Sequence, residues 1–144
     1  MNTAEARAWA AGLFLADGTV GIYENNHTGK TFHRVSFALR MMDQEPVHMF
    51  NEIIENPRAI REYTEGRKGT LMYSSEQASC EEVLRIGSWL APLLVGRKQQ
   101  KMYIVMKLCE DIRRNKHVKP HTPEIIKYRR QLHEACLRAG AETE

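Results

Sequence analysis

Ala10-Ala11-Gly12-Leu13-Phe14-Leu15-Ala16-Asp17-Gly18 is the most informative segment of the chain. It reads as the end of a helix over residues 3–17, because Asn2 and Glu5 can form a capping box and Asp17-Gly18 is a typical stop. All sides of this helix are apolar or small, so both sides need to be buried. A four-stranded sheet in a chain of this size covers only one of them. We therefore expect a second copy of the chain on the other side, across a two-fold axis.

The expected contact face of this homodimer contains small residues. A glycine inside a helix costs roughly 1 kcal/mol relative to alanine, and Gly12 is explained if two helix backbones approach closely there. An ordinary core helix packed under the C-terminal helices is the alternative that periodicity leaves open. The residues expected at the dimer interface are Ala8, Ala11, Gly12 and Leu15.

Asp17 is unusual because a carboxylate at a helix C-terminus faces the negative end of the helix dipole. If two such helices pair, two Asp17 side chains come close together, and like charges at short range require protons or cations. Oxygen ligands of this kind suit Mg²⁺ or Mn²⁺, and a backbone carbonyl such as that of Ala16 could add a further ligand. A simple Asp-Gly turn is the alternative interpretation.

The rest of the chain predicts an α+β fold in the order αββαββα, with a four-stranded antiparallel sheet and additional C-terminal helices. Two segments with apolar residues at every second position flank the turn at Asn25–Lys30, which indicates a β-hairpin. A second hairpin is centred on Glu65–Gly69. The predicted strands are 19–23, 33–40, 59–64 and 70–74, and the predicted later helices are 44–56, 80–91, 97–115 and 123–140.

Composition indicates a single domain over residues 1–144, because a core of this size can hardly be divided. The longest apolar run, Ala8–Ala16, is far shorter than the roughly 20 residues of a membrane span. No secretory signal is evident either, so we expect an intracellular protein in the cytoplasm, nucleoid or the interior of an organelle. The three cysteines are widely spaced and are expected to be reduced thiols.

Charge is distributed unevenly along the chain. Residues 1–96 hold 9 Lys+Arg and 12 Asp+Glu, a balance of −3, whereas residues 97–144 hold 12 and 6, a balance of +6. A basic C-terminal third is compatible with contacts to nucleic-acid phosphates, and equally with a solvated helical face.

The nonapeptide at residues 10–18 resembles the motif that names the LAGLIDADG homing endonucleases. The likeness covers about residues 4–115. The chain contains a single copy of the motif, and a single copy implies the homodimeric branch of the family, like the single-motif enzymes of organellar introns. The likeness also implies a sheet shaped as a DNA-binding saddle. The further segments that carry it are Ser36-Phe37, Asp43 and Glu45, Leu90–Leu94, and Arg97-Lys98-Gln99-Gln100.

The resemblance implies hydrolysis of both strands of a long pseudo-palindromic DNA target. Asp17 would be the metal-binding carboxylate, one from each subunit, with Lys98 near the scissile phosphate and Gln99 ordering water. Side chains on the open face of the sheet would read base edges, and those at the hairpin turns would hold phosphates. The implied DNA-binding residues are Thr19, Tyr23, Lys30, Arg34, Ser36, Arg40, Arg61, Tyr63, Arg67 and Lys68.

Two other functions stay open. One is a catalytically weak or inactive relative that acts as a DNA-binding regulator or as a maturase of intron RNA, since Leu15, Met41 or Met42, and Val47 stand at positions that are polar in the family. The pair Asp17 and Lys98 argues against a purely binding role. The second is a zinc or protein-interaction module built around three residues in the C-terminal part of the chain. These residues are Cys109, His117 and His121.

Overall fold

A computed structural model describes residues 1–141 and confirms the predicted α+β order; the last three residues of the predicted single domain lie outside this range. The predicted αββαββα order is followed by a short 3-10 helix and two further α-helices, as the predicted additional C-terminal helices required. The elements are α1 (Thr3–Asp17), β1 (Gly18–His27), β2 (Lys30–Met41), α2 (Gln44–Ile53), β3 (Arg61–Glu65), β4 (Thr70–Gln77), α3 (Cys80–Leu90), the short 3-10 helix η1 (Ala91–Leu93), α4 (Gly96–Arg114) and α5 (Pro123–Ala141).

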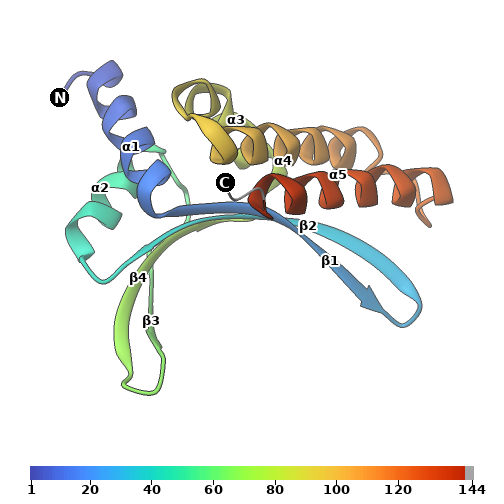
Figure 1. Cartoon of the computed structure of the whole chain (residues 1–144), viewed down its shortest axis with the longest axis horizontal. Coiled ribbons are helices and arrows are strands. Elements are labelled where there is room, and N and C mark those ends of the chain that lie inside the picture. The colour runs from blue at the N-terminus through green and yellow to red at the C-terminus, as the bar shows by residue number, and fades with distance from the viewer. Residues whose placement is uncertain (142–144) are drawn as a thin grey trace.

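The four strands form one antiparallel sheet in the order β1-β2-β4-β3. The ends of β2 and β4 pair in the middle, and the two hairpins diverge from there, so the sheet is arched like a saddle (Figure 1). Helices α4 and α5 pack on β1 and β2, and α2 packs on β4. The helices of residues 1–141 therefore lie on the convex side of the arch or at its end, and none of them covers the concave side (Figure 1).

The core lies between the convex face of the sheet and the helices. Phe14 of α1 stacks on Phe37 of β2 with 4.7 Å between ring centroids, and on Phe50 of α2 with 6.1 Å. All three side chains are fully buried, and each contributes roughly 1.5–3 kcal/mol by leaving water. The alternation predicted for the two long strands is confirmed, since the following side chains are buried: Val20, Ile22, Val35, Phe37 and Leu39.

Ala38 lies on the open face of the sheet by the same alternation, yet it is only 2% exposed. In the sheet it lies between Thr19 of β1 and Glu76 of β4. A methyl group is shorter than both neighbouring side chains, which therefore shield it from solvent.

The junction of α1 and β1 has no loop, because Gly18 is both the cap of the helix and the first residue of the strand. The predicted helix stop at this glycine is confirmed, but its backbone is extended (φ −76°, ψ 157°) and needs no glycine. A Cβ atom at this position would lie 2.5 Å from Cε1 of the Phe14 ring. Gly18 is therefore required by the close approach of that ring, which in turn fixes where Asp17 stands.

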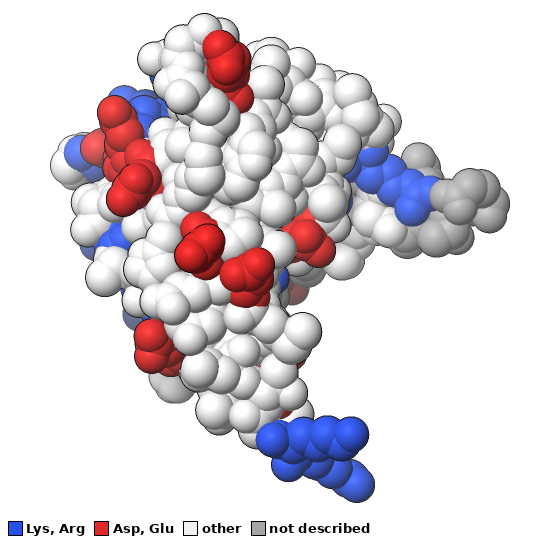
Figure 2. Space-filling model, turned by 90° about the vertical axis from the view of Figure 1, so that its left-hand side faces the viewer, with Lys and Arg blue, Asp and Glu red and all other residues white. Residues whose placement is uncertain are grey.

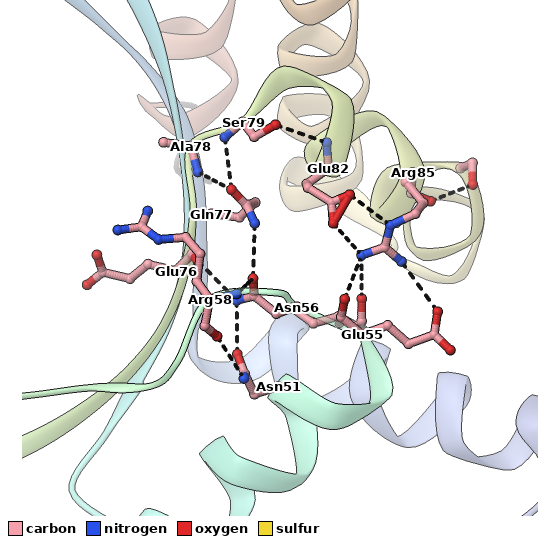
Figure 3. Close-up of polar contacts among 12 residues, drawn as sticks. Asn51, Glu55, Asn56, Arg58, Glu76, Gln77, Ala78, Ser79, Glu82 and Arg85 are labelled. Atoms are coloured by element: carbon pink, nitrogen blue, oxygen red, sulfur yellow. Dashed lines mark hydrogen bonds and ion pairs between the residues drawn. The ribbon is translucent and has the colours of Figure 1, made fainter.

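A polar network ties α2 to β4 and α3, and it accounts for two differences from the predicted boundaries (Figure 3). Helix α2 ends at Ile53 instead of 56, and the Arg85 guanidinium donates to the backbone carbonyls of Ile54 and Glu55 just beyond it. Strand β4 extends to Gln77 instead of 74, because Gln77 donates to the Asn56 side chain at 3.0 Å. Buried polar groups with hydrogen-bond partners can thus continue a strand.

Helices α4 and α5 are joined by a buried ion pair, in which Arg129 Nε donates to Asp111 Oδ2 at 2.8 Å. Asn115 donates to the other oxygen of the same carboxylate. The cysteines are free thiols, as expected. Across residues 1–141 the helices lack the length and apolar character that crossing a bilayer requires.

Candidate active site

The end of α1 brings Asp17 and Lys98 together, although 81 positions separate them in the chain. Lys98 Nζ donates to the carbonyl oxygens of Phe14 (3.1 Å) and Leu15 (2.7 Å), which are left unpaired at a helix C-terminus. Burial is the main cause of a lowered pKa for Lys98, and the nearby Asp17 charge acts in the opposite direction. The Asp17 side chain is exposed. Within residues 1–141 its carboxylate forms neither a hydrogen bond nor an ion pair.

Gln99 follows Lys98 and Ala16 precedes Asp17 in the chain, but the Gln99 side chain is hydrogen-bonded whereas Ala16 is exposed. Gln99 Nε2 donates to the Ala91 carbonyl oxygen at 3.0 Å, so its amide holds the start of α4 against η1. No hydrogen bond joins this amide to Asp17 in the described chain. Ala16 is exposed next to Asp17 at the helix end.

The outer side of α1 is uncovered in the single chain. Ala8 and Gly12 are exposed, Leu15 is 38% exposed, and a Cβ atom at Gly12 would meet no atom within 4 Å. Ala11, also expected at the dimer interface, is only 3% exposed because it turns with Ala10 and Phe14 into the core of its own chain. Figure 2 shows this side of the molecule, which is largely uncharged, with scattered acidic side chains.

The strand residues predicted to bind DNA share the concave face of the sheet. The register pairs Tyr23 with Arg34, and Ser74 of β4 with both Arg40 and Arg61. The same alternation places Thr19, Ser36 and Tyr63 on this face. Lys30, Arg67 and Lys68 lie at or next to the two hairpin turns, and the tip of the β3–β4 hairpin is basic (Figure 2).

Glu76 is a site residue that the sequence did not reveal. Its Oε2 atom lies 3.6 Å from Arg40 and 3.6 Å from Arg61, and it accepts a hydrogen bond from Ser74 Oγ at 2.7 Å. In Figure 3 it points away from the side occupied by Gln77 and Asn56, that is, toward the concave face. A strand extended to residue 77 would have placed it there, because alternate residues share a face.

A second unforeseen cluster lies between the β1–β2 hairpin and α5. Glu24 Oε1 accepts hydrogen bonds from His33 Nε2 (2.9 Å) and Arg130 Nε (3.1 Å). Burial lowers the pKa of His33 although the hydrogen bond to Glu24 raises it. Part of the basic surplus of the C-terminal third, namely Arg129 and Arg130, is thus used in contacts within the chain.

The residues of the alternative zinc module are not gathered into one site. Cys109 is buried, and a hydrogen bond with its thiol lowers the pKa of Cys80. His121 Nδ1 lies 3.4 Å from a nitrogen of Arg129. Over the described part of a single chain, no three His, Cys, Asp or Glu side chains are placed to hold a metal ion.

Comparisons with known proteins find a match at the level of structure. No family model matches the sequence, and no curated protein matches it significantly. The homing endonuclease I-CvuI, in complex with the I-CreI target, superposes with a TM-score of 0.75 at 14% identity over 99% of this chain and 86% of that one. The archaeal intron-encoded homing endonuclease I-Vdi141I, complexed with DNA, gives 0.71 at 14% identity over 98% and 86%.

A third matched structure belongs to a protein of which this chain covers less than half. The LAGLIDADG homing endonuclease I-LtrWI, bound to target DNA, gives a TM-score of 0.67 at 16% identity over 81% of this chain but 40% of that one. The chain thus spans most of the length of two matched proteins and less than half of the third. It has the fold of the LAGLIDADG homing endonucleases, as the nonapeptide predicted.

Proposed function

We propose that this chain forms a homodimer that cuts duplex DNA at a specific site with the help of divalent metal ions. The observation that carries the proposal is the exposed Asp17 carboxylate at the end of a helix whose outer side is small and uncovered. The Lys98 amine stands beside it.

The dimer would form by packing α1 against its copy. The exposed residues Ala8, Gly12 and Leu15 lie on one side of the helix, and an interface of small residues lets two backbones approach closely. In packing about a two-fold axis each subunit uses the same surface, so the end of α1 in one copy would meet the end of α1 in the other. The coverage of the matched structures supports this arrangement. The chain corresponds to most of the length of one matched protein and to under half of another, so the longer protein has room for two such units in one chain.

The donor set fits divalent ions when two copies meet. One chain offers the Asp17 carboxylate and the neighbouring carbonyl of Ala16, and the second copy would add the same oxygens. Hard oxygen donors suit Mg²⁺ or Mn²⁺. Ions held there would activate water for hydrolysis and neutralise charge on the scissile phosphate.

Lys98 would act on the phosphate beside that site. Its ammonium group is held at the negative end of α1 by two carbonyl oxygens, so it is already oriented before DNA binds. A fixed positive charge next to the reacting phosphate stabilises the charge that develops in the transition state. Gln99 stays a candidate for ordering water, and its contact with the Ala91 carbonyl holds the start of α4 in place.

The concave face of the sheet would lie in the major groove. Strands admitted to this groove can read base edges, and the exposed Tyr23, Arg34 and Arg61 offer donors for that purpose. The basic hairpin turns would contact phosphates. Two sheets related by a two-fold axis read two related half-sites, so the target would be long and pseudo-palindromic.

The test is cleavage of a pool of randomised duplexes, together with the DNA that flanks the coding sequence, with Mg²⁺ or with EDTA. The proposal expects metal-dependent double-strand breaks at one recurring sequence, and loss of these breaks in Asp17→Asn. Tight binding without breaks would favour a DNA-binding regulator, and preferential binding of structured intron RNA would favour a maturase. Stoichiometric zinc without nucleic-acid binding would contradict the proposal altogether.

A further inference from the structure

Three charged side chains meet on the concave face, each from a different strand. Arg40 of β2 and Arg61 of β3 lie on either side of β4, and both approach the Glu76 carboxylate at 3.6 Å. The Ser74 hydroxyl, which lies between the two arginines in the register, donates to the same carboxylate. This arrangement is built from four side chains and leaves the cluster a net positive charge.

The cluster restrains two side chains that would otherwise move freely. Glu76 is 22% exposed, whereas Arg40 and Arg61 are 42% and 62% exposed, so the carboxylate is the fixed point and the guanidinium groups reach outward. Arg61 also lies over the ring of Tyr63, 4.8 Å from its centroid. An arginine that is already ordered loses less conformational freedom when it binds.

A carboxylate on this face needs an explanation. On a surface that faces DNA phosphates a negative charge weakens the general attraction. Ion pairs as exposed as these contribute little to folding stability. Glu76 therefore opposes affinity for DNA in general, and a residue that does so can still serve selectivity, because selectivity depends on the difference between right and wrong sequences.

We propose that Glu76 is a specificity-determining residue, which holds Arg40 and Arg61 for guanine recognition and thereby restricts one or two adjacent positions in each half of the target to G·C pairs. Arginine donates to O6 and N7 of guanine in the major groove, and a carboxylate oxygen accepts from N4 of cytosine. Both partners of a G·C pair are thus matched by one cluster. This inference rests on the proposed role of the sheet in DNA binding.

The test compares Glu76→Gln with wild type on duplexes carrying a randomised core, in buffer with EDTA, by sequencing the bound fraction. Wild type is expected to select G·C pairs at symmetric positions of the two half-sites. In Glu76→Gln this selectivity should fall by roughly 5- to 150-fold at those positions alone, the scale of a bidentate base contact, and binding to an unrelated duplex should rise. Glu62→Gln is the matched control, because it removes the same charge from the opposite face of the sheet. It should leave both the selectivity and the binding to an unrelated duplex unchanged.

A second variant separates selectivity from folding. Ser74→Ala removes only the hydroxyl that orients Glu76, and should weaken selection at the same positions while all charges remain. Unaltered base preferences in both Glu76→Gln and Ser74→Ala would overturn the inference and leave DNA binding intact. If Glu76→Gln does not fold, Ser74→Ala decides alone. Failure of wild type to select any sequence would refute the proposed function itself.

Discussion

Replacing Gly18 by alanine should destabilise the protein although the backbone there is suitable for any residue. The added Cβ would lie 2.5 Å from Cε1 of Phe14, and that ring is fully buried and stacked on Phe37 at 4.7 Å, so it cannot move aside freely. Overpacking of this kind costs typically 1–3 kcal/mol, and the rigid stack places Gly18→Ala near the upper end, at about 2–3 kcal/mol. The melting temperature should fall by roughly 5–10 °C.

Urea unfolding at one fixed protomer concentration would measure this effect, since the stability of a dimer depends on concentration. Gly21→Ala is the matched control, because a Cβ atom at Gly21 meets nothing within 4 Å. Its stability should change by less than about 0.5 kcal/mol, as for other substitutions free of steric conflict. Equal stability of Gly18→Ala and Gly21→Ala would refute the steric conflict with the Phe14 ring at the α1–β1 junction.

Three further changes test other parts of the structure. Gly12→Phe should leave the fold of the single chain intact, because a side chain at Gly12 meets no atom of its own chain. The added ring would occupy the space that a second copy needs, so analytical ultracentrifugation should show a monomer in place of a dimer. An unchanged dimer would contradict packing through Gly12. Lys98→Met should reduce DNA cleavage by roughly 100-fold by removing a charge beside the phosphate, and a rate within threefold of wild type (about 0.7 kcal/mol) would count against it. Burial lowers the pKa of His33 in the fold, while the unfolded chain takes up a proton near the ordinary pKa of 6.5, so stability should fall as the pH drops below 6.5. His33→Gln should lose this part of the pH dependence in urea unfolding at pH 7.5 and 5.5, and an unchanged dependence would show that His33 is not its source.

Strong local patterns predicted most of the fold. The alternation from Val35 to Leu39 placed the buried face of β2 correctly, because a strand with one face on the core must repeat every second residue. The capping residue Asn2 likewise marked the beginning of α1. The end of β4 was missed because Ser75 and Gln77 look like loop residues until their partners, Asn51 and Asn56, are known.

Sequence patterns named some residues of the candidate site and missed others, for different physical reasons. Asp17 was singled out by its place at a helix C-terminus and Lys98 by the family resemblance, and the structure brings them together at the end of α1. Ala11 was assigned to the dimer interface because all sides of α1 are apolar, and such a helix does not reveal which side faces its own core. Glu76 escaped notice because a single acidic residue in a polar strand carries no signal until the neighbouring strands supply Arg40 and Arg61.

The most direct test of the central claim is to mix subunits and count double-strand breaks. Wild-type and Asp17→Asn chains would be unfolded together and refolded in known proportions, and cleavage of a duplex recovered from the randomised pool would be measured with Mg²⁺. If each of two copies supplies one Asp17 to the cutting of both strands, breaks should follow the square of the wild-type fraction, about one quarter of full activity in an equal mixture. A linear decrease, with about one half remaining, would contradict the account.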